Sequence, residues 1–439
     1  MTPLVLGLVI AVVTLLVLAT GIPIAFGLGL VAMGFLFWAD GARAIHAFAD
    51  TLFAGLNDFT LVSIPMFIIM GAAVAASRAG SDLYEAMHRW LSRVPGSMVI
   101  ANLGACALFA ALTGSSPATC AAIGKMGIPE MRRRGYSADL ATGSIAAGGT
   151  LGILIPPSIT FILYGIASET SIGRLFLAGI LPGLMLTALF MAWALFLAWR
   201  RGEALEDRSA RVSWAARLEV LPRVVPFVLV IAAVLYSLYG GVATPSEAAG
   251  VGALACIVLV MVVYRQWRPG QLWPIFRDGM RESGMIVLII ATSILYGYML
   301  SSLYVTQSIA QGIAEASINR WVLMALINLL LVVAGCFMPP AAIILMTTPI
   351  IAPIIANAGF DPVWFGVILT INMELGLITP PVGLNLFVIN GIVPDVKLPT
   401  ILKGALPFMG CMVVAILILC VFPEIATWLP DALMGPVPR

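Results

Sequence analysis

Two stretches of this sequence, "TLGILIPPS" at 150–158 and "ELGLITPPV" at 374–382, are near copies that lie 224 residues apart. Each places a Pro–Pro pair inside a long apolar segment. Proline has no backbone N–H, so it removes a helical hydrogen bond and breaks the helix. The prolines concerned are Pro156, Pro157, Pro380 and Pro381. The carbonyl groups that lose their helical partners are those of Gly152, Ile153, Gly376 and Leu377. We therefore predict two broken helices, over 138–165 and over 362–393.

The composition predicts a membrane protein. Of the 439 residues, 61% are hydrophobic and 10% are charged, whereas a soluble domain carries roughly 25% charged residues. Long apolar runs joined by short polar connections are typical of helices that cross a bilayer. The six cysteines lie in apolar segments without the spacing of a metal site, so they are interpreted as packing residues. The predicted fold class is an all-α polytopic membrane protein.

The positions of the basic residues predict how the chain is threaded. Most of the 23 lysines and arginines fall in five connections, which should be cytoplasmic because basic loops stay on that side. The connections are 78–93, 125–134, 200–223, 265–281 and 397–403. Two of them flank the apolar stretch 97–130, which should therefore be a re-entrant hairpin with its tip at 113–118. The stretch 320–357 should form a second hairpin of opposite orientation, and both termini should lie in the periplasm.

The similarity of the two breaks extends outward along the chain. Further glycine and proline pairs at the same offset are Pro129 with Pro353, Gly135 with Gly359, and Gly152 with Gly376. An odd number of crossings in each copy inverts the second copy, and inverted repeats with broken helices are typical of secondary transporters. We expect a first repeat at 1–200, a cytoplasmic linker at 201–221 and a second repeat at 222–430. Chance similarity between apolar segments is the alternative.

The first hairpin tip and the second break carry groups suited to ions. The tip Thr113-Gly114-Ser115-Ser116 offers three hydroxyls and exposed helix-end N–H groups, which suit an anionic substrate. Carbonyl and hydroxyl oxygens at the breaks are the ligands that small hard cations prefer. Asn372 and Glu374 lie deep in an apolar segment, where a carboxylate is a functional candidate. The alternatives are packing kinks at the prolines, and a structural role for Glu374 as partner of a distant hydroxyl or amide.

Four ordered motifs resemble those of one known family. They are "GSSPATCAAIGKMGIPEMRRRGY" (114–136), "GGTLGILIPPS" (148–158), "GGVATPSEAAG" (240–250) and "GLITPPVGLNLFV" (376–388). They resemble the large membrane subunit of tripartite ATP-independent periplasmic (TRAP) transporters over nearly the whole chain. The resemblance implies an elevator-type transporter of the bacterial inner membrane that takes up an organic acid anion with a Na⁺ gradient. It also implies two partners, a small membrane subunit on a separate chain and a periplasmic substrate-binding protein.

The resemblance further implies where ligands bind. Na⁺, the transported coupling ion, would bind near Ser115, Ser116, Thr150 and Gly152 in the first half, and near Gly335, Asn372, Gly376 and Thr379 in the second. The Glu374 carboxylate and the carbonyls of Ile153 and Leu377 complete the expected cation-binding set. The organic acid is expected at Thr113, Gly114, Ser115, Ser116 and Asn385. The second tip, "CFMPPAA", has few polar side chains, so backbone oxygens would have to serve there.

Two other functions are weighed against this one. A self-sufficient dicarboxylate carrier, coupled to Na⁺ or H⁺, would transport without a binding protein. A polytopic enzyme or channel is less favoured, because His46 and His88 are the two histidines and neither has a plausible catalytic partner. We expect no enzyme activity and no prosthetic group. The net charge of +2 gives no indication of a nucleic-acid partner.

Overall fold

The first half of the chain forms a series of helices. The computed structural model describes residues 2–92, 96–202, 213–315 and 318–436, and all regular elements among them are helical, which confirms the all-α prediction. The elements of the first series are α1 (Pro3–Ala19), α2 (Ile24–Asp40), α3 (Arg43–Leu56), η1 (Phe59–Val62), α4 (Ser63–Ala75), α5 (Ala79–Leu91), α6 (Ser97–Thr113), α7 (Ser116–Arg133), α8 (Ala138–Thr150), η2 (Leu151–Ile153), α9 (Ile159–Ser168) and α10 (Ile172–Arg200).

The second half forms a second series of helices. Its elements are α11 (Trp214–Tyr239), α12 (Pro245–Tyr264), α13 (Pro269–Ser302), α14 (Val305–Glu315), α15 (Arg320–Gly335), α16 (Pro340–Asn357), α17 (Pro362–Leu377), α18 (Leu384–Ile392), α19 (Leu398–Val421) and α20 (Glu424–Met434). The helix pair α6–α7 corresponds to α15–α16, and the broken helix α8–α9 corresponds to α17–α18. The starts of α8 and α17, Ala138 and Pro362, are 224 residues apart.

Long apolar helices account for the membrane character of the fold. Six described helices are long and apolar enough to cross a bilayer: α10, α11, α12, α13, α16 and α19. The chain between Arg43 and Ala75 gives a seventh span if α3 and the following η1–α4 segment, which meet at a bend of 62°, are counted as one broken helix. Large apolar side chains such as Leu254, Val262 and Leu417 are exposed, as expected where hydrocarbon rather than water covers the surface.

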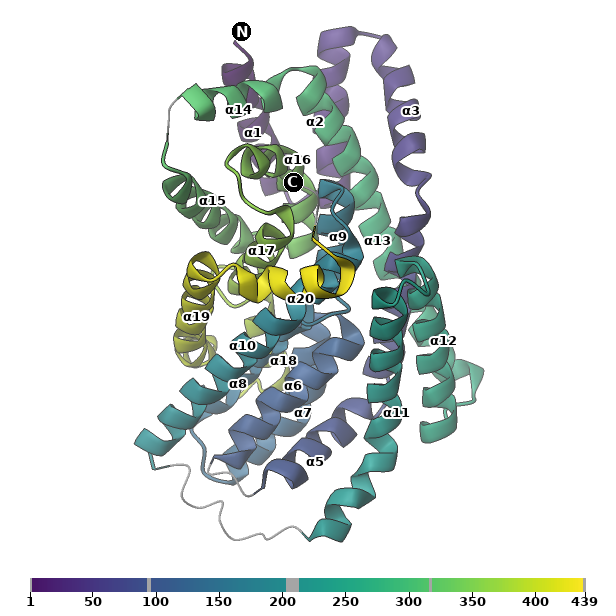
Figure 1. Cartoon of the computed structure of the whole chain (residues 1–439), viewed down its shortest axis with the longest axis vertical. Helices are drawn as coiled ribbons and strands as arrows, with labels where there is room; N and C mark the ends of the chain where they lie inside the picture. The colour runs from purple at the N-terminus through teal and green to yellow at the C-terminus, as the bar shows by residue number, and fades with distance from the viewer. Residues whose placement is uncertain (1, 93–95, 203–212, 316–317, 437–439) are drawn as a thin grey trace.

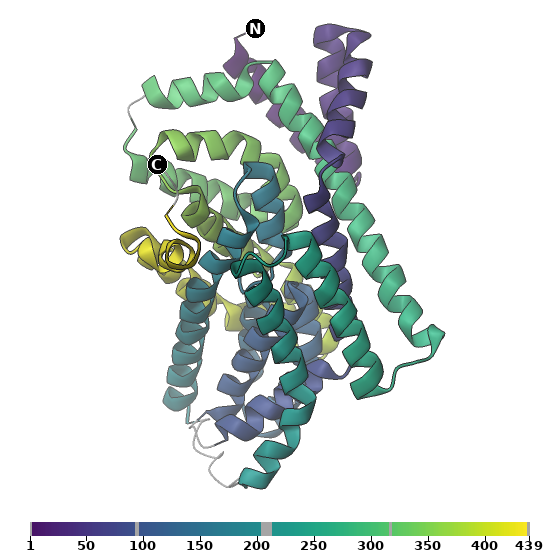
Figure 2. The same ribbon diagram turned by 45° about the vertical axis from the view of Figure 1, so that its right-hand side comes forward.

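The helices pack as two groups, each built from both halves of the chain. In one group, α7, α8 and α10 of the first half pack on α17, α18 and α19 of the second half, and α6 packs on α7, α8 and α10. In the other, α2 and α4 pack on α12 and α13, and α1 contacts α14. Figure 1 shows α14 across one end of the molecule and α5 near the other, and Figure 2 shows the same separation after rotation. The candidate site lies where the two groups meet.

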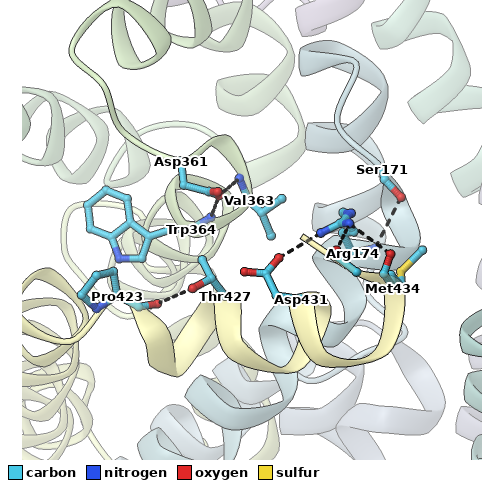
Figure 3. A network of polar contacts seen from close by, with 10 residues as sticks. Ser171, Arg174, Asp361, Val363, Trp364, Pro423, Thr427, Asp431 and Met434 are labelled. Carbon is cyan, nitrogen blue, oxygen red and sulfur yellow. Dashed lines mark hydrogen bonds and ion pairs between the residues drawn. The ribbon is translucent and has the colours of Figure 1, made fainter. Parts of the chain in front are cut away.

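The last helix, α20, is fixed to the start of α10 by a polar network (Figure 3). Arg174 donates to the Asp431 carboxylate at 3.1 Å and to the Met434 carbonyl oxygen at 3.4 Å. Beside it, the Asp361 carboxylate caps α17 by accepting from the backbone N–H groups of Val363 and Trp364 at 2.7 and 2.9 Å. Asp361 thus stabilises the start of α17, which leads to the second break, and α17 also packs on α20.

Candidate functional site

The first hairpin turns at Gly114 and Ser115, within the predicted tip at 113–118. Gly114 has φ +58°, a left-handed conformation that favours glycine. A Cβ at Gly114 would lie 2.8 Å from the Pro157 carbonyl oxygen, so the tip is in backbone contact with the first Pro–Pro break. The tip and the break, represented here by Gly114 and Pro157, which are 43 residues apart in the sequence, therefore form one site.

Gly152 makes the closest approach between this tip and the broken helix. It lies in the 3₁₀ turn η2, and a Cβ there would be 2.6 Å from the Ser115 carbonyl oxygen and 2.9 Å from the Ser116 amide nitrogen. Only glycine fits where two backbones meet so closely. Backbone oxygens and N–H groups from both segments are thereby concentrated in a small volume.

Hydroxyl groups satisfy several of the backbone oxygens at the first break. The Ser158 hydroxyl donates to the Ile153 carbonyl oxygen at 2.5 Å. That oxygen lacks a helical N–H donor, because the donor position is Pro157, but it does not lack a hydrogen bond. The Thr150 hydroxyl donates to the Ala147 carbonyl at 2.7 Å, and the Thr113 hydroxyl bonds to the Phe109 carbonyl at 3.1 Å. These side chains stabilise the backbone around the break and at the end of α6.

A buried polar contact joins the first tip to the second half of the chain. The Asn385 amide nitrogen donates to the Ser116 hydroxyl oxygen at 2.8 Å and to the Ala146 carbonyl at 3.2 Å. The Ser116 hydroxyl is 3.1 Å from the Asn385 amide oxygen, to which it donates. Both side chains are fully buried. Asn385 thus connects α18, which follows the second break, to the start of α7 and to α8.

The second hairpin meets the second break in a similar way. A Cβ at Gly376 would lie 2.6 Å from the Gly335 Cα, so the ends of α15 and α17 are in backbone contact. The Val382 N–H donates to the Cys336 carbonyl at 3.1 Å. The Thr379 hydroxyl donates to the Leu375 carbonyl at 2.5 Å. At the second tip it is therefore backbone groups that contact the break, as expected for a tip with few polar side chains.

Both Pro–Pro bonds, Pro156–Pro157 and Pro380–Pro381, are cis, but the two breaks differ in exposure. Pro156 and Pro157 are buried, and α10 covers the segment beside them, since a Cβ at Gly179 would lie 2.6 Å from the Leu154 carbonyl oxygen. Pro380 and Pro381 are exposed. The second break is therefore the more accessible of the two.

Asn372 and Glu374 lie in α17, close to the Gly335–Gly376 contact, and both are fully buried. The Asn372 amide nitrogen donates to the Asn328 amide oxygen at 2.5 Å and to the Ile368 carbonyl at 2.8 Å. Neither carboxyl oxygen of Glu374 has a hydrogen-bond partner among the described residues, and the same holds for the Asn372 amide oxygen. The alternative in which Glu374 bonds a distant hydroxyl or amide therefore lacks such a bond in the described part of the chain.

The tips and breaks of both halves surround one cavity of about 710 Å³. Four helices begin at its wall, since the lining includes the first residues of α7, α9, α16 and α18. These residues are Ser116, Pro117, Ile159, Thr160, Pro340, Ala341 and Leu384. Helix N-termini carry unpaired N–H groups and the positive end of the helix dipole, so this wall suits a negatively charged group. The facing wall is formed by the start of α2 and by residues 282–289 of α13.

The predicted site residues are distributed unevenly around this cavity. Gly114, Ser115, Ser116, Ile153 and Leu377 line it. Thr113 and Asn385, expected to contact the substrate, are not in its lining and instead hold the backbone around the tip. The lining also includes residues outside the predicted site set, among them Pro339 of the second tip and Glu282 of α13. Pro339 belongs to the "CFMPPAA" sequence of the second tip, whereas no local sequence pattern distinguishes Glu282 from the charged residues around it.

Comparison with known proteins identifies a family and several related permeases. The family described as tripartite ATP-independent periplasmic transporter, DctM component, matches residues 11–425. The C4-dicarboxylate TRAP transporter large permease protein DctM of Pseudomonas aeruginosa is 36% identical over 396 residues, which are 90% of this chain and 91% of that protein. The isethionate TRAP transporter permease protein DctMQ of Oleidesulfovibrio alaskensis is 34% identical over 93% of this chain, which spans 64% of that protein.

A solved structure has a similar fold. The YdaH transporter of Alcanivorax borkumensis superposes with a TM-score of 0.64 over 90% of this chain and 91% of that one. The sequences are 14% identical, so this likeness concerns the fold alone.

Proposed function

This chain belongs to the family of DctM components of tripartite ATP-independent periplasmic transporters, and we propose that it takes up an organic acid anion driven by a Na⁺ gradient. It is a bacterial membrane permease and not an enzyme. The observation that supports the transport proposal best is the convergence of two hairpin tips and two broken helices on one cavity. Discontinuous helices whose ends meet at a central site are the usual way in which secondary transporters bind ions and substrates.

The cavity between the tips is the proposed substrate site. The acid group would face the helix starts of α7 and α16, and at the start of α7 Ser115 and Ser116 supply hydroxyl and N–H groups. Thr113 and Asn385 would act indirectly by holding this tip in place. The cavity lining contains no basic side chain among the described residues, so helix dipoles and co-transported cations would have to balance the anion.

Two cation sites are proposed, one at each tip-and-break contact. The first would use oxygens of Ser115, Ser116, Thr150, Gly152 and Ile153. The second would use oxygens of Gly335, Asn372, Glu374, Gly376, Leu377 and Thr379. The unpartnered carboxyl of Glu374 supports the second site, because a fully buried carboxylate is costly unless a cation or a donor meets it.

The proposal includes two partners and a mode of movement. A small membrane subunit and a periplasmic binding protein would complete the transporter, as the family description "tripartite" suggests. The inverted repeats would be 1–200 and 222–430, joined by a cytoplasmic linker at 201–221, with both termini in the periplasm. The group that contains the tips and breaks would move as an elevator against the group that contains α2, α4, α12 and α13. A self-sufficient carrier would instead transport without the binding protein.

We expect single cysteines at two matched positions to be labelled from opposite sides of the membrane. Arg133 at the end of α7 and Asn357 at the end of α16 are exposed and 224 residues apart. In a background without the native cysteines, Arg133→Cys should react with an impermeant maleimide only from the cytoplasm, and Asn357→Cys only from the periplasm. Labelling of both from the same side would contradict the inverted repeats.

Uptake should depend on Na⁺ and on the binding protein. We expect uptake of a labelled organic acid into liposomes holding the large and small subunits to fall at least about tenfold when K⁺ replaces Na⁺. It should also fall to background when the binding protein is omitted, and ATP should have no effect. Full uptake without the binding protein would favour the self-sufficient carrier, and full uptake in K⁺ would reject Na⁺ coupling.

A further inference from the structure

The wall of the cavity formed by α13 carries a single ionisable side chain, Glu282. Among the described residues that line the cavity, it is the only acidic one, and none is basic. Glu282 is exposed to the cavity, and its carboxylate has no hydrogen bond or ion pair in the described part of the chain. A negative charge thus faces the proposed substrate site without a protein partner.

Neighbouring charged residues on α13 do not pair with the Glu282 carboxylate. One turn earlier, Arg277 and Asp278 bond to each other at 2.8 Å and lie outside the cavity lining. Arg281 is adjacent in sequence but is likewise not part of the lining. Successive residues of a helix point about 100° apart, so the side chains of Arg281 and Glu282 diverge.

The two walls of the cavity therefore favour groups of opposite charge. The helix starts at the two tips favour a negative group, whereas Glu282 on α13 favours a positive one. A dicarboxylate would bring a second negative charge toward Glu282, and like charges at close range repel each other. A molecule with a carboxylate at one end and an ammonium group at the other matches both walls.

We propose that the substrate of this permease is a zwitterion, an organic acid that also bears a cationic nitrogen group, and that Glu282 receives the cationic group. The proposal rests on the proposed function, because it takes the cavity between the tips as the substrate site. It adds the substrate class and a specificity residue on α13, outside the tips and breaks.

Three four-carbon probes with different ends test this inference. Succinate, butyrate and 4-aminobutyrate share the chain length and differ in the group opposite one carboxylate. We expect 4-aminobutyrate to stabilise the purified large and small subunit complex against heat, in Na⁺ buffer, at about tenfold lower concentration than succinate. This corresponds to about 1.4 kcal/mol. Butyrate should fall between them, because it neither attracts nor repels Glu282.

The variant Glu282→Gln keeps the size of the side chain and removes its charge. It should abolish the preference for 4-aminobutyrate over succinate, while Asp278→Asn, one turn away on the same helix, should leave it unchanged. Binding of 4-aminobutyrate no tighter than that of succinate, including no binding of either, would overturn the inference. So would an unaltered preference in Glu282→Gln, or a loss of Na⁺-dependent stabilisation in that variant.

The uptake assay separates this inference from the proposed function. Na⁺-dependent uptake of succinate but not of any amino or betaine acid would reject the zwitterion and leave the proposed function standing. Absence of Na⁺-dependent uptake for every acid would reject the proposed function, and the binding preference would still decide whether the cavity selects a zwitterion.

Discussion

Glu374→Gln is expected to abolish Na⁺-dependent uptake while leaving the protein folded. Both carboxyl oxygens of Glu374 are fully buried in α17 and have no partner among the described residues. In the proposed site a bound cation would stabilise this carboxylate, and the neutral amide removes the charge that would attract the cation. We expect uptake to fall at least about 100-fold, a loss of at least ~2.7 kcal/mol in transition-state stabilisation.

Thermal unfolding provides a readout of this site that does not require transport. A ligand that binds only the folded protein stabilises it by about 2.7 kcal/mol at 100 times its Kd, so the Tm of the unaltered protein should rise with Na⁺ concentration. Glu374→Gln should lose most of this rise, and Glu374→Met should raise the Tm in Na⁺-free buffer by removing an unpaired buried carboxyl group. Glu424→Gln, an exposed carboxylate at the start of α20, is the control. An undiminished Na⁺ effect on the Tm of Glu374→Gln would exclude Glu374 from ion binding.

Alanine at either glycine between a tip and a break should also have a large effect. A Cβ at Gly152 or at Gly376 would lie 2.6 Å from backbone atoms of Ser115 or Gly335, closer than real Cβ contacts allow. The backbones must separate, and a displacement near 1 Å at a binding site costs up to about 100-fold in rate. Overpacking of this kind destabilises a protein by about 1–3 kcal/mol. We expect uptake to fall by about two orders of magnitude in Gly152→Ala and in Gly376→Ala.

Gly391→Ala is a matched control for these two variants. Gly391 lies in α18, and a Cβ there would meet no atom within 4 Å. This variant should transport normally, because alanine is favoured over glycine in a helix by about 1 kcal/mol. Normal uptake and Na⁺ affinity in Gly152→Ala and Gly376→Ala would show that close contact of the tips with the breaks is not required for transport.

Much of the local structure could be predicted from residue types alone. The predicted hairpin 320–357 coincides with α15 and α16 together, and the predicted break 362–393 coincides with α17 and α18 to within one residue. Proline and glycine act on their own backbone, so their positions mark helix ends before any tertiary contact forms. The helices α14 and α20 were not predicted, because short amphipathic helices depend on the surfaces that they cover.

The candidate site could be predicted in part. Ser115, Ser116 and Gly152 were identified from motifs, and they do lie together at one contact. The Asn328 amide oxygen that accepts a hydrogen bond from Asn372, 44 residues away, is a partner that the sequence does not reveal. The bond from the Ser158 hydroxyl to the Ile153 carbonyl is local but depends on the geometry of the break. Glu282 could not be found from the sequence, because many charged residues flank the apolar spans and only the cavity distinguishes this one.

The sequence by itself determined that this chain is an all-α membrane protein with two broken helices and two hairpins in matching positions. These features follow from composition and from the missing N–H of proline, which act locally. Only the tertiary structure decided that the four features surround one cavity, that Asn385 links the two halves, and that the second break is exposed while the first is buried. The reason is that such contacts join segments that are separate in the sequence, Asn385 and Ser116 by 269 residues, and their partners are chosen by how whole helices pack.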